Sequence, residues 1–136
     1  MRSIFLILFA VILLSACSTK NDYDSVFKNP ELYSKAVGEL TEVITHDIFT
    51  PPVASRIYAY SNIAAYEVIA GKSTNFKSLS TKLAGLKSTP LPDKEINTEL
   101  SALLALSYVG QELTFSKDSV QKTIDDHIQL AKNHGM

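Results

Sequence analysis

The segment from Pro51 to Gly71, PPVASRIYAYSNIAAYEVIAG, constrains the fold more than any other part of the chain. Two prolines at its start suit the first turn of a helix, where the amide donors would lack partners anyway, and Gly71 can end the helix. Between them, Arg56, Asn62 and Glu67 are dispersed around the helical wheel, so the apolar residues leave no polar face. We therefore predict a helix that must be covered on nearly every side.

These three polar side chains are candidate structural residues. Buried polar groups cost a few kcal/mol unless they are hydrogen bonded, so we predict that Arg56, Asn62 and Glu67 are buried and that each has a partner outside this helix. Arg56 and Glu67 lie about 16 Å apart along the helix axis and cannot pair with each other. Two sources of partners remain open, namely neighbouring helices of this chain and polypeptide that the chain does not contain.

The rest of the chain beyond residue 29 also has a helical hydrophobic period, and it contains no alternating run long enough for a strand. We predict an all-α fold, a bundle of about four helices that is an incomplete part of a larger helical domain. Its elements are a helix from Pro30 to the Thr50 break, the helix from Thr50 to Gly71, a loop over 72–92 with one helical turn near Leu79 to Leu86, a buried central helix from Asp93 to Phe115, and a helix from Ser116 or Asp118 to Gly135.

The N-terminus, MRSIFLILFAVILLSAC, has the pattern of an export signal: Arg2, an apolar run, and small residues before a cysteine. The apolar run is shorter than the roughly 20 residues that span a bilayer. LSAC also resembles the bacterial lipobox, in which the cysteine is lipidated. We predict a cleaved lipoprotein signal peptide at residues 1–16, lipidated Cys17 with a polar tether at 17–29, and a helical domain at 30–136. The alternative for Cys17 is a thiol near the end of an uncleaved hydrophobic segment.

Lipidation at Cys17 would make the bilayer a partner and place the protein in a bacterial envelope, at the outer membrane or the periplasmic face rather than in the cytoplasm.

A net charge of -1 does not indicate a nucleic-acid partner, and Arg2 and Arg56 are the only arginines. The neighbouring acids and histidines of His46-Asp47 and Asp125-Asp126-His127 point apart on a helix, so we predict no metal site.

A resemblance becomes specific at residues 47–71, DIFTPPVASRIYAYSNIAAYEVIAG. This stretch resembles the N-terminal helix of bacterial proteins related to the vanadium-dependent haloperoxidases and the type 2 phosphatidic acid phosphatase superfamily. There, an acid, a spacer, Pro-Pro, Ala-x-Arg, an aromatic residue, Ala-Ala-Tyr and a second acid open an all-helical domain. The matching positions are Asp47, Pro51, Pro52, Ala54, Arg56, Tyr58, Tyr60, Ala64, Ala65, Tyr66 and Glu67. The resemblance extends over residues 30–136 and also fits the lipoprotein members.

The family holds vanadate or phosphate with residues of later motifs, Lys-x6-Arg-Pro, Pro-Ser-Gly-His and Ser-Arg-x5-His. None of these motifs occurs in this sequence, so no catalytic residue is assigned. The resemblance thus implies the N-terminal scaffold portion of a membrane-anchored haloperoxidase-like or acid-phosphatase-like protein, inactive alone, whose full-length form binds vanadate or a phosphate substrate. Its implied partner is a C-terminal catalytic bundle. The alternative is a complete small helical lipoprotein that acts as a binding or interaction module.

Overall fold

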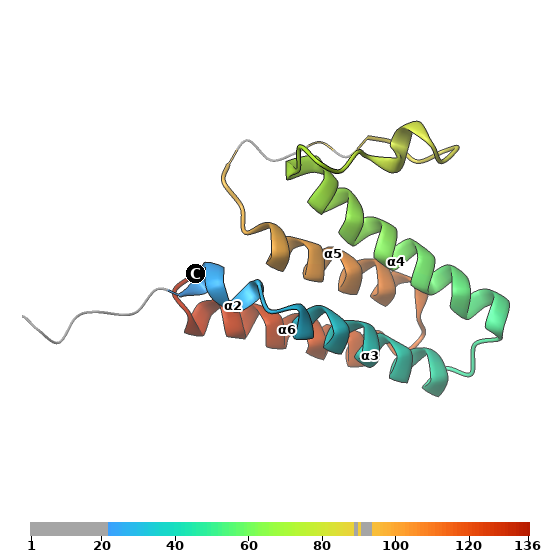
Figure 1. The fold of residues 1–136 in the computed structure, drawn as a ribbon. Helices are drawn as coiled ribbons and strands as arrows, with labels where there is room; N and C mark the ends of the chain where they lie inside the picture. Colours follow the sequence, from blue (N-terminus) through green and yellow to red (C-terminus); the bar gives the residue numbers. More distant parts are fainter. Residues whose placement is uncertain (1–21, 89, 91–93) are drawn as a thin grey trace, which may run out of the picture.

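The structure, a computed structural model, describes residues 22–88, 90 and 94–136. Over these residues the chain is helical and contains no strand, which confirms the predicted fold class (Figure 1). The predicted signal peptide and Cys17 lie outside the described residues. The elements are α2 (Tyr23–Phe27), α3 (Pro30–His46), α4 (Pro51–Lys72), the 3-10 turn η1 (Leu79–Thr81), α5 (Thr98–Leu113) and α6 (Lys117–Asn133). No helix in this part of the chain has the length and hydropathy needed to span a membrane.

Local sequence signals set most of the helix ends. The side chain of Asn29 accepts a hydrogen bond from the Glu31 amide at 3.0 Å and caps α3. Gly135, which follows α6, has a φ of 98°, in the left-handed region that glycine tolerates. Gly71, by contrast, lies inside α4, which continues to Lys72, so the predicted stop at Gly71 is wrong.

The start of α5 also differs from the prediction. Asp93 lies outside the described residues, and residues 94–97 are not helical. The helix begins at Thr98 because Asn97 caps it, with its side-chain oxygen accepting a hydrogen bond from the Leu100 amide at 2.8 Å. The central helix is therefore shorter at its N-terminal end than the apolar pattern indicated.

The polar tether predicted over residues 17–29 is wrong for its second half, because Tyr23–Phe27 forms α2. Phe27 is 3% exposed and belongs to the main hydrophobic core. Asp24 accepts a hydrogen bond from Asn97 Nδ2 at 3.0 Å, and Asp22 lies against His134 Nδ1. These contacts fix α2 to the start of α5 and to the end of α6.

Helix α5 forms the centre of the bundle, between α4 on one side and the α3–α6 pair on the other (Figure 1). Close packing on α5 is possible at Gly110, where an added Cβ would lie 2.9 Å from the Leu40 side chain and 3.4 Å from Ser61 Oγ. The core residues of α5 are Leu100, Ala102, Leu103 and Leu106. Because α5 is in contact with all three of the other long helices, its prediction as the buried central helix is confirmed.

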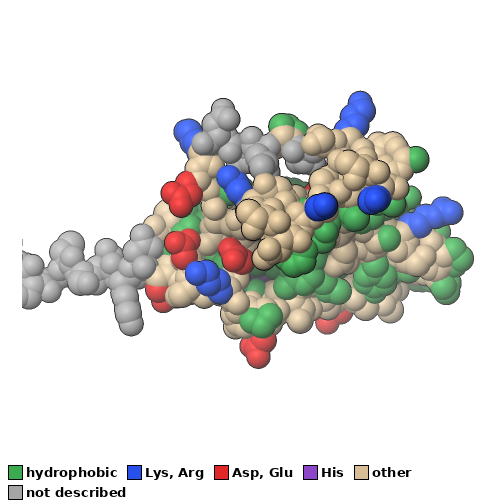
Figure 2. Space-filling view, turned by 45° about the horizontal axis from the view of Figure 1, so that its top comes forward, with side chains coloured by type: hydrophobic (Ala, Val, Ile, Leu, Met, Phe, Trp, Pro, Cys, Tyr) green, Lys and Arg blue, Asp and Glu red, His purple; other side chains and the backbone are tan. Residues whose placement is uncertain are grey.

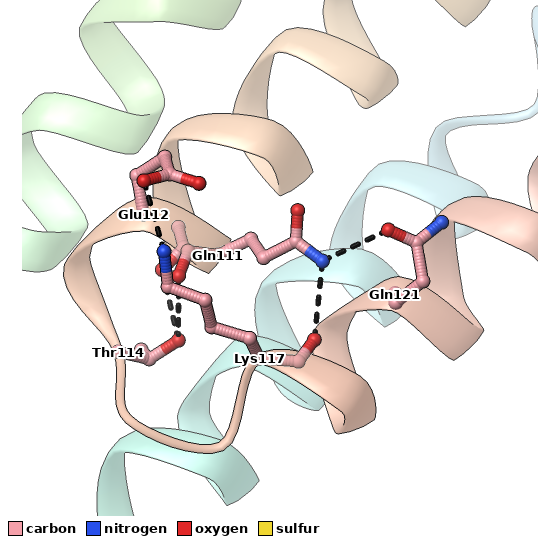
Figure 3. Close-up of polar contacts among 6 residues, drawn as sticks. Gln111, Glu112, Thr114, Lys117 and Gln121 are labelled. Atoms are coloured by element: carbon pink, nitrogen blue, oxygen red, sulfur yellow. Dashed lines mark hydrogen bonds and ion pairs between the residues drawn. The ribbon is translucent and has the colours of Figure 1, made fainter.

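Polar contacts fix the turn between α5 and α6 (Figure 3). Gln111 Nε2 donates hydrogen bonds to Gln121 Oε1 at 2.9 Å and to the Lys117 carbonyl at 3.1 Å. Lys117 Nζ in turn lies 2.9 Å from a carboxylate oxygen of Glu112. The turn is therefore held from both of its helices, which sets the antiparallel arrangement of α5 and α6.

Candidate functional site: the outer face of helix α4

Helix α4 packs on α5 along one stripe. Its buried residues are Ile57, Ser61, Ala65, Glu67 and Ala70; the first three are four residues apart and form the stripe, whereas Glu67 is covered by the loop after the helix. Outside this stripe, Val53, Tyr60 and Ile69 are 38%, 52% and 36% exposed. The prediction that this helix is covered on nearly every side is therefore wrong for this chain. The reason is that α4 packs mainly on α5, while α3 contacts it through side chains such as Tyr33 and Thr41, so the remaining side of α4 is in contact with solvent.

A groove of about 410 Å³ runs along this outer side. Its lining consists of Tyr33 of α3 and of Ala59, Asn62, Ile63, Tyr66 and Ile69 of α4. Tyr33 Oη donates a hydrogen bond to Asn62 Oδ1 at 2.8 Å, and Asn62 Nδ2 donates to the Tyr58 carbonyl at 2.8 Å. Burial raises the pKa of Tyr33 above its usual value. Asn62 is half-buried, and its partner from outside α4 belongs to the neighbouring helix α3.

Glu67 is 6% exposed, and its carboxylate holds the segment that follows α4. Ser78 Oγ donates a hydrogen bond to one carboxylate oxygen at 2.6 Å, and the Leu79 amide donates to the other at 2.7 Å. Both donors lie at the start of η1, so the negative charge also faces the amide end of that short helical turn. The partners of Glu67 thus come from the loop of this chain and not from a neighbouring long helix.

Arg56 was predicted to be buried, and this prediction is wrong because the residue is exposed. In the described part of the chain, none of the ion pairs or side-chain hydrogen bonds involves its guanidinium. Arg56 is three residues after Val53 and four before Tyr60, so the three residues share the outer face of α4. A lone cation therefore stands among apolar side chains on a face that this chain leaves uncovered.

Asp47 and His127, two of the acids and histidines considered as metal ligands, take part in hydrogen bonds and in the core. Asp47 accepts hydrogen bonds from the Phe115 amide at 2.7 Å, from the Ser116 amide at 3.0 Å and from Ser116 Oγ. The Ser116 hydroxyl is the main cause that lowers the pKa of Asp47. His127 is 6% exposed, and burial lowers its pKa. Over the residues that the structure describes, no group of three or more His, Cys, Asp or Glu side chains could hold a metal ion.

Sequence reasoning missed Tyr33 and Ser78, the partners of Asn62 and Glu67. The signal for Ser78 was present, since a serine directly before the predicted helical turn is a common cap, and Ser78 Oγ does accept a hydrogen bond from the Ser80 amide at 3.1 Å. Tyr33 lies three residues before the buried Ala36, so its ring falls beside the buried stripe of α3. Its pairing with Asn62 depends on the packing of α3 near α4 and has no local signal.

Comparison with known proteins relates this chain to a solved structure. No protein-family model matches the sequence, and a search of curated proteins finds no match. Among solved structures, the chain is similar to a crystal structure described as the first bacterial vanadium-dependent iodoperoxidase, with 41% sequence identity and a TM-score of 0.74. The match covers 77% of this chain and 26% of that one. This similarity supports the predicted relationship with vanadium-dependent haloperoxidases. The chain spans about a quarter of the length of the iodoperoxidase that it matches.

Vanadate is the cofactor that this similarity suggests, and the described residues do not fit it. An oxyanion needs clustered cationic donors. A polar cleft of about 480 Å³ between α3 and α6 contains Lys35, Lys122 and His46. Its lining also contains the carboxylates of Glu39, Glu42 and Asp126, which would repel an oxyanion. The groove on α4 has no cation in its lining, so neither site provides the donors that vanadate requires.

Proposed function

We propose that this chain is the N-terminal scaffold portion of a membrane-anchored protein of the vanadium haloperoxidase or acid phosphatase type. The observation that carries the proposal is the 41% identity to an iodoperoxidase of which the chain matches only 26%. In this role, α5 and the helices around it form a packed support. Vanadate, or phosphate in a phosphatase, would be bound by the remainder of such a protein.

We also propose that the chain is catalytically inactive by itself. Two facts support this inactivity. The motifs Lys-x6-Arg-Pro, Pro-Ser-Gly-His and Ser-Arg-x5-His are absent from the sequence, and the described clefts do not fit an oxyanion. Asp47, His127 and Glu67, which are the residue types that often carry chemistry, are instead engaged in capping, in the core and in holding a loop. The chain alone is expected to show no halide oxidation with added vanadate and no phosphatase activity.

Membrane anchoring through Cys17 is proposed on the sequence alone. The export signal and the LSAC segment support it, and lipid chains on one cysteine would hold the domain at a bilayer. Detergent phase separation of cells that express the full chain tests this part. The wild-type protein is expected in the detergent phase with the added mass of lipid, whereas Cys17→Ser should lose both properties. A wild-type protein without lipid in the aqueous phase would contradict the anchor.

The mass of the native product in the membrane fraction of the producing cell tests the scaffold proposal. An antibody against residues 94–113 would detect it, and a band much heavier than 14.9 kDa would support the proposal. A lipidated product with the mass of this chain would contradict it. That result would favour the alternative, a complete small binding module, which also has the groove on α4 as a possible docking site.

A further inference from the structure

We propose that the outer face of α4, together with Tyr33, is the surface on which the remaining helical part of a peroxidase-like domain packs, and that an acidic side chain of that part pairs with Arg56. This inference rests on the proposed function and names the interface between the scaffold and the remainder. Because the chain matches only 26% of the iodoperoxidase, the proposed occupant is polypeptide of the kind that forms the rest of that protein.

The apolar character of the outer face of α4 supports its role as a packing surface. Val53, Tyr60 and Ile63 lie three, four and seven residues from Arg56 and share its side of α4, whereas Ile69 lies farther round the helix. Helices without a polar side are normally buried in a larger core. Figure 2 shows one face of the molecule, on which hydrophobic side chains lie across the middle and Lys and Arg side chains lie both beside them and at the edges. A contiguous apolar surface with a polar rim is the usual form of an interaction site.

The groove on α4 is a place where side chains of a packing partner could lie. It lies between Tyr33 and the outer side of α4, and the hydrogen bond from Tyr33 to Asn62 fixes its floor. A second hollow of about 230 Å³ shares Tyr33 and Ile69 with the groove and extends toward Phe27. The two hollows are contiguous at these shared residues and form one depression, whose second part also has Lys28 and Glu99 in its lining. Such a depression accepts side chains that project from one face of a second helix.

Charge distinguishes the proposed occupant from a second copy of this chain. The charged residues of α4 are Arg56, Glu67 and Lys72, and both cations are exposed. Glu67 is buried and hydrogen-bonded to Ser78 and Leu79, so it is not available to a partner. A second α4 face would therefore offer Arg56 no carboxylate. An acidic residue on the covering helix would pair with Arg56 and complete this face.

The length of the similar iodoperoxidase also supports this occupant. The iodoperoxidase that this chain resembles is about four times as long as the matched region, since that region is 26% of its chain. A helix like α4 in so large a protein has more polypeptide available to cover it than this chain supplies. The polypeptide that continues a peroxidase-like fold is therefore the occupant to which the observations point.

Photocrosslinking in the producing cell tests the interface on the native product. A photoreactive phenylalanine derivative would replace Tyr60, which is 52% exposed on α4, and in a matched control Tyr108, which is 47% exposed on α5. We expect an efficient crosslink from position 60 to a peroxidase-like sequence that is not part of residues 1–136, and only background from position 108. Mass spectrometry of the crosslinked peptide would identify the covering segment and the acid near Arg56.

An Arg56→Glu variant provides a second measurement, because this exposed residue does not contact the core and its substitution should not prevent folding. We expect it to reduce the crosslink at position 60, and exchange of the charges between Arg56 and the identified acid should restore it. A heavy native product without an enriched crosslink at position 60 would overturn the inference and leave the proposed function standing. A crosslink to another copy of this chain, to lipid or to an unrelated protein would also overturn it. A native product no heavier than this chain would overturn both.

Discussion

Helices α4 and α5 have the same kind of sequence and different surroundings. Neither has a continuous polar face, and each carries a few dispersed polar residues. In α5, the exposed residues are only Glu99, Tyr108 and Glu112, because α3, α4 and α6 all contact it. In α4, the side away from α5 remains exposed. A hydrophobic pattern thus predicts that a helix needs cover, whereas the cover itself depends on the other elements that are present.

The largest difference between the two helices is expected from truncation of apolar side chains. Leu106 of α5 is 1% exposed, so Leu106→Ala should lower the free energy of unfolding by about 2–5 kcal/mol through lost burial and a residual cavity. Tyr60→Ala on the outer face of α4 should change it by about 0.5 kcal/mol or less. Urea denaturation followed by circular dichroism measures both. Equal losses at the two positions would show that α4 is covered on its outer side too.

The contribution of a polar residue to stability should also depend on whether it is buried. Glu67→Ala would leave the Leu79 amide and Ser78 without their acceptor, and we expect a loss of about 1–3 kcal/mol. The loop after α4 should also be cleaved faster by trypsin at Lys77 and Lys82. Glu112→Ala on α5 is the matched control, because its ion pair with Lys117 is exposed and should contribute about 1 kcal/mol at most. A Glu67→Ala variant with wild-type stability and cleavage would contradict the proposed loop anchor.

Much of the fold could be predicted from local signals, and the candidate site could not. Prolines, the Asn29 cap and a terminal glycine locate helix ends of α3, α4 and α6, since these residues act on the backbone next to them, whereas the Asn97 cap of α5 was overlooked. Helix α2 was missed because five residues are too few to show a period. The burial of Glu67 and the exposure of Arg56 depend on which segments pack against α4. That information is tertiary, and the two residues have similar sequence surroundings.

The stability of the folded protein should depend on pH through the buried His127. Its ordinary pKa is 6.5, and burial on α6 lowers the pKa in the folded protein, while the charge of Glu39 partly opposes the shift. The unfolded chain therefore binds a proton more readily. Stability should be constant above the unfolded pKa and should fall as the pH decreases through about 6.5 toward the folded pKa.

Thermal unfolding between pH 8 and pH 5 measures this dependence. His127→Leu, which places an apolar side chain on the buried stripe of α6, should reduce it. A His127→Leu variant with the same pH dependence as the wild-type protein would contradict the assignment to His127.

The smallest effect in the isolated chain is expected at Arg56, and it gives the sharpest test of the comparison between α4 and α5. Because the guanidinium is exposed and makes no ion pair with the described residues, Arg56→Ala should change the free energy of unfolding of this chain by about 0.5 kcal/mol or less. In a longer native product, the same substitution should lower it by about 1–3 kcal/mol, because a buried carboxylate would lose its partner. A large loss in this chain alone would mean that α4 is already covered. Unchanged stability of the longer product with lost turnover would instead assign Arg56 to the chemistry, and α4 would then be a part of the active site rather than its support.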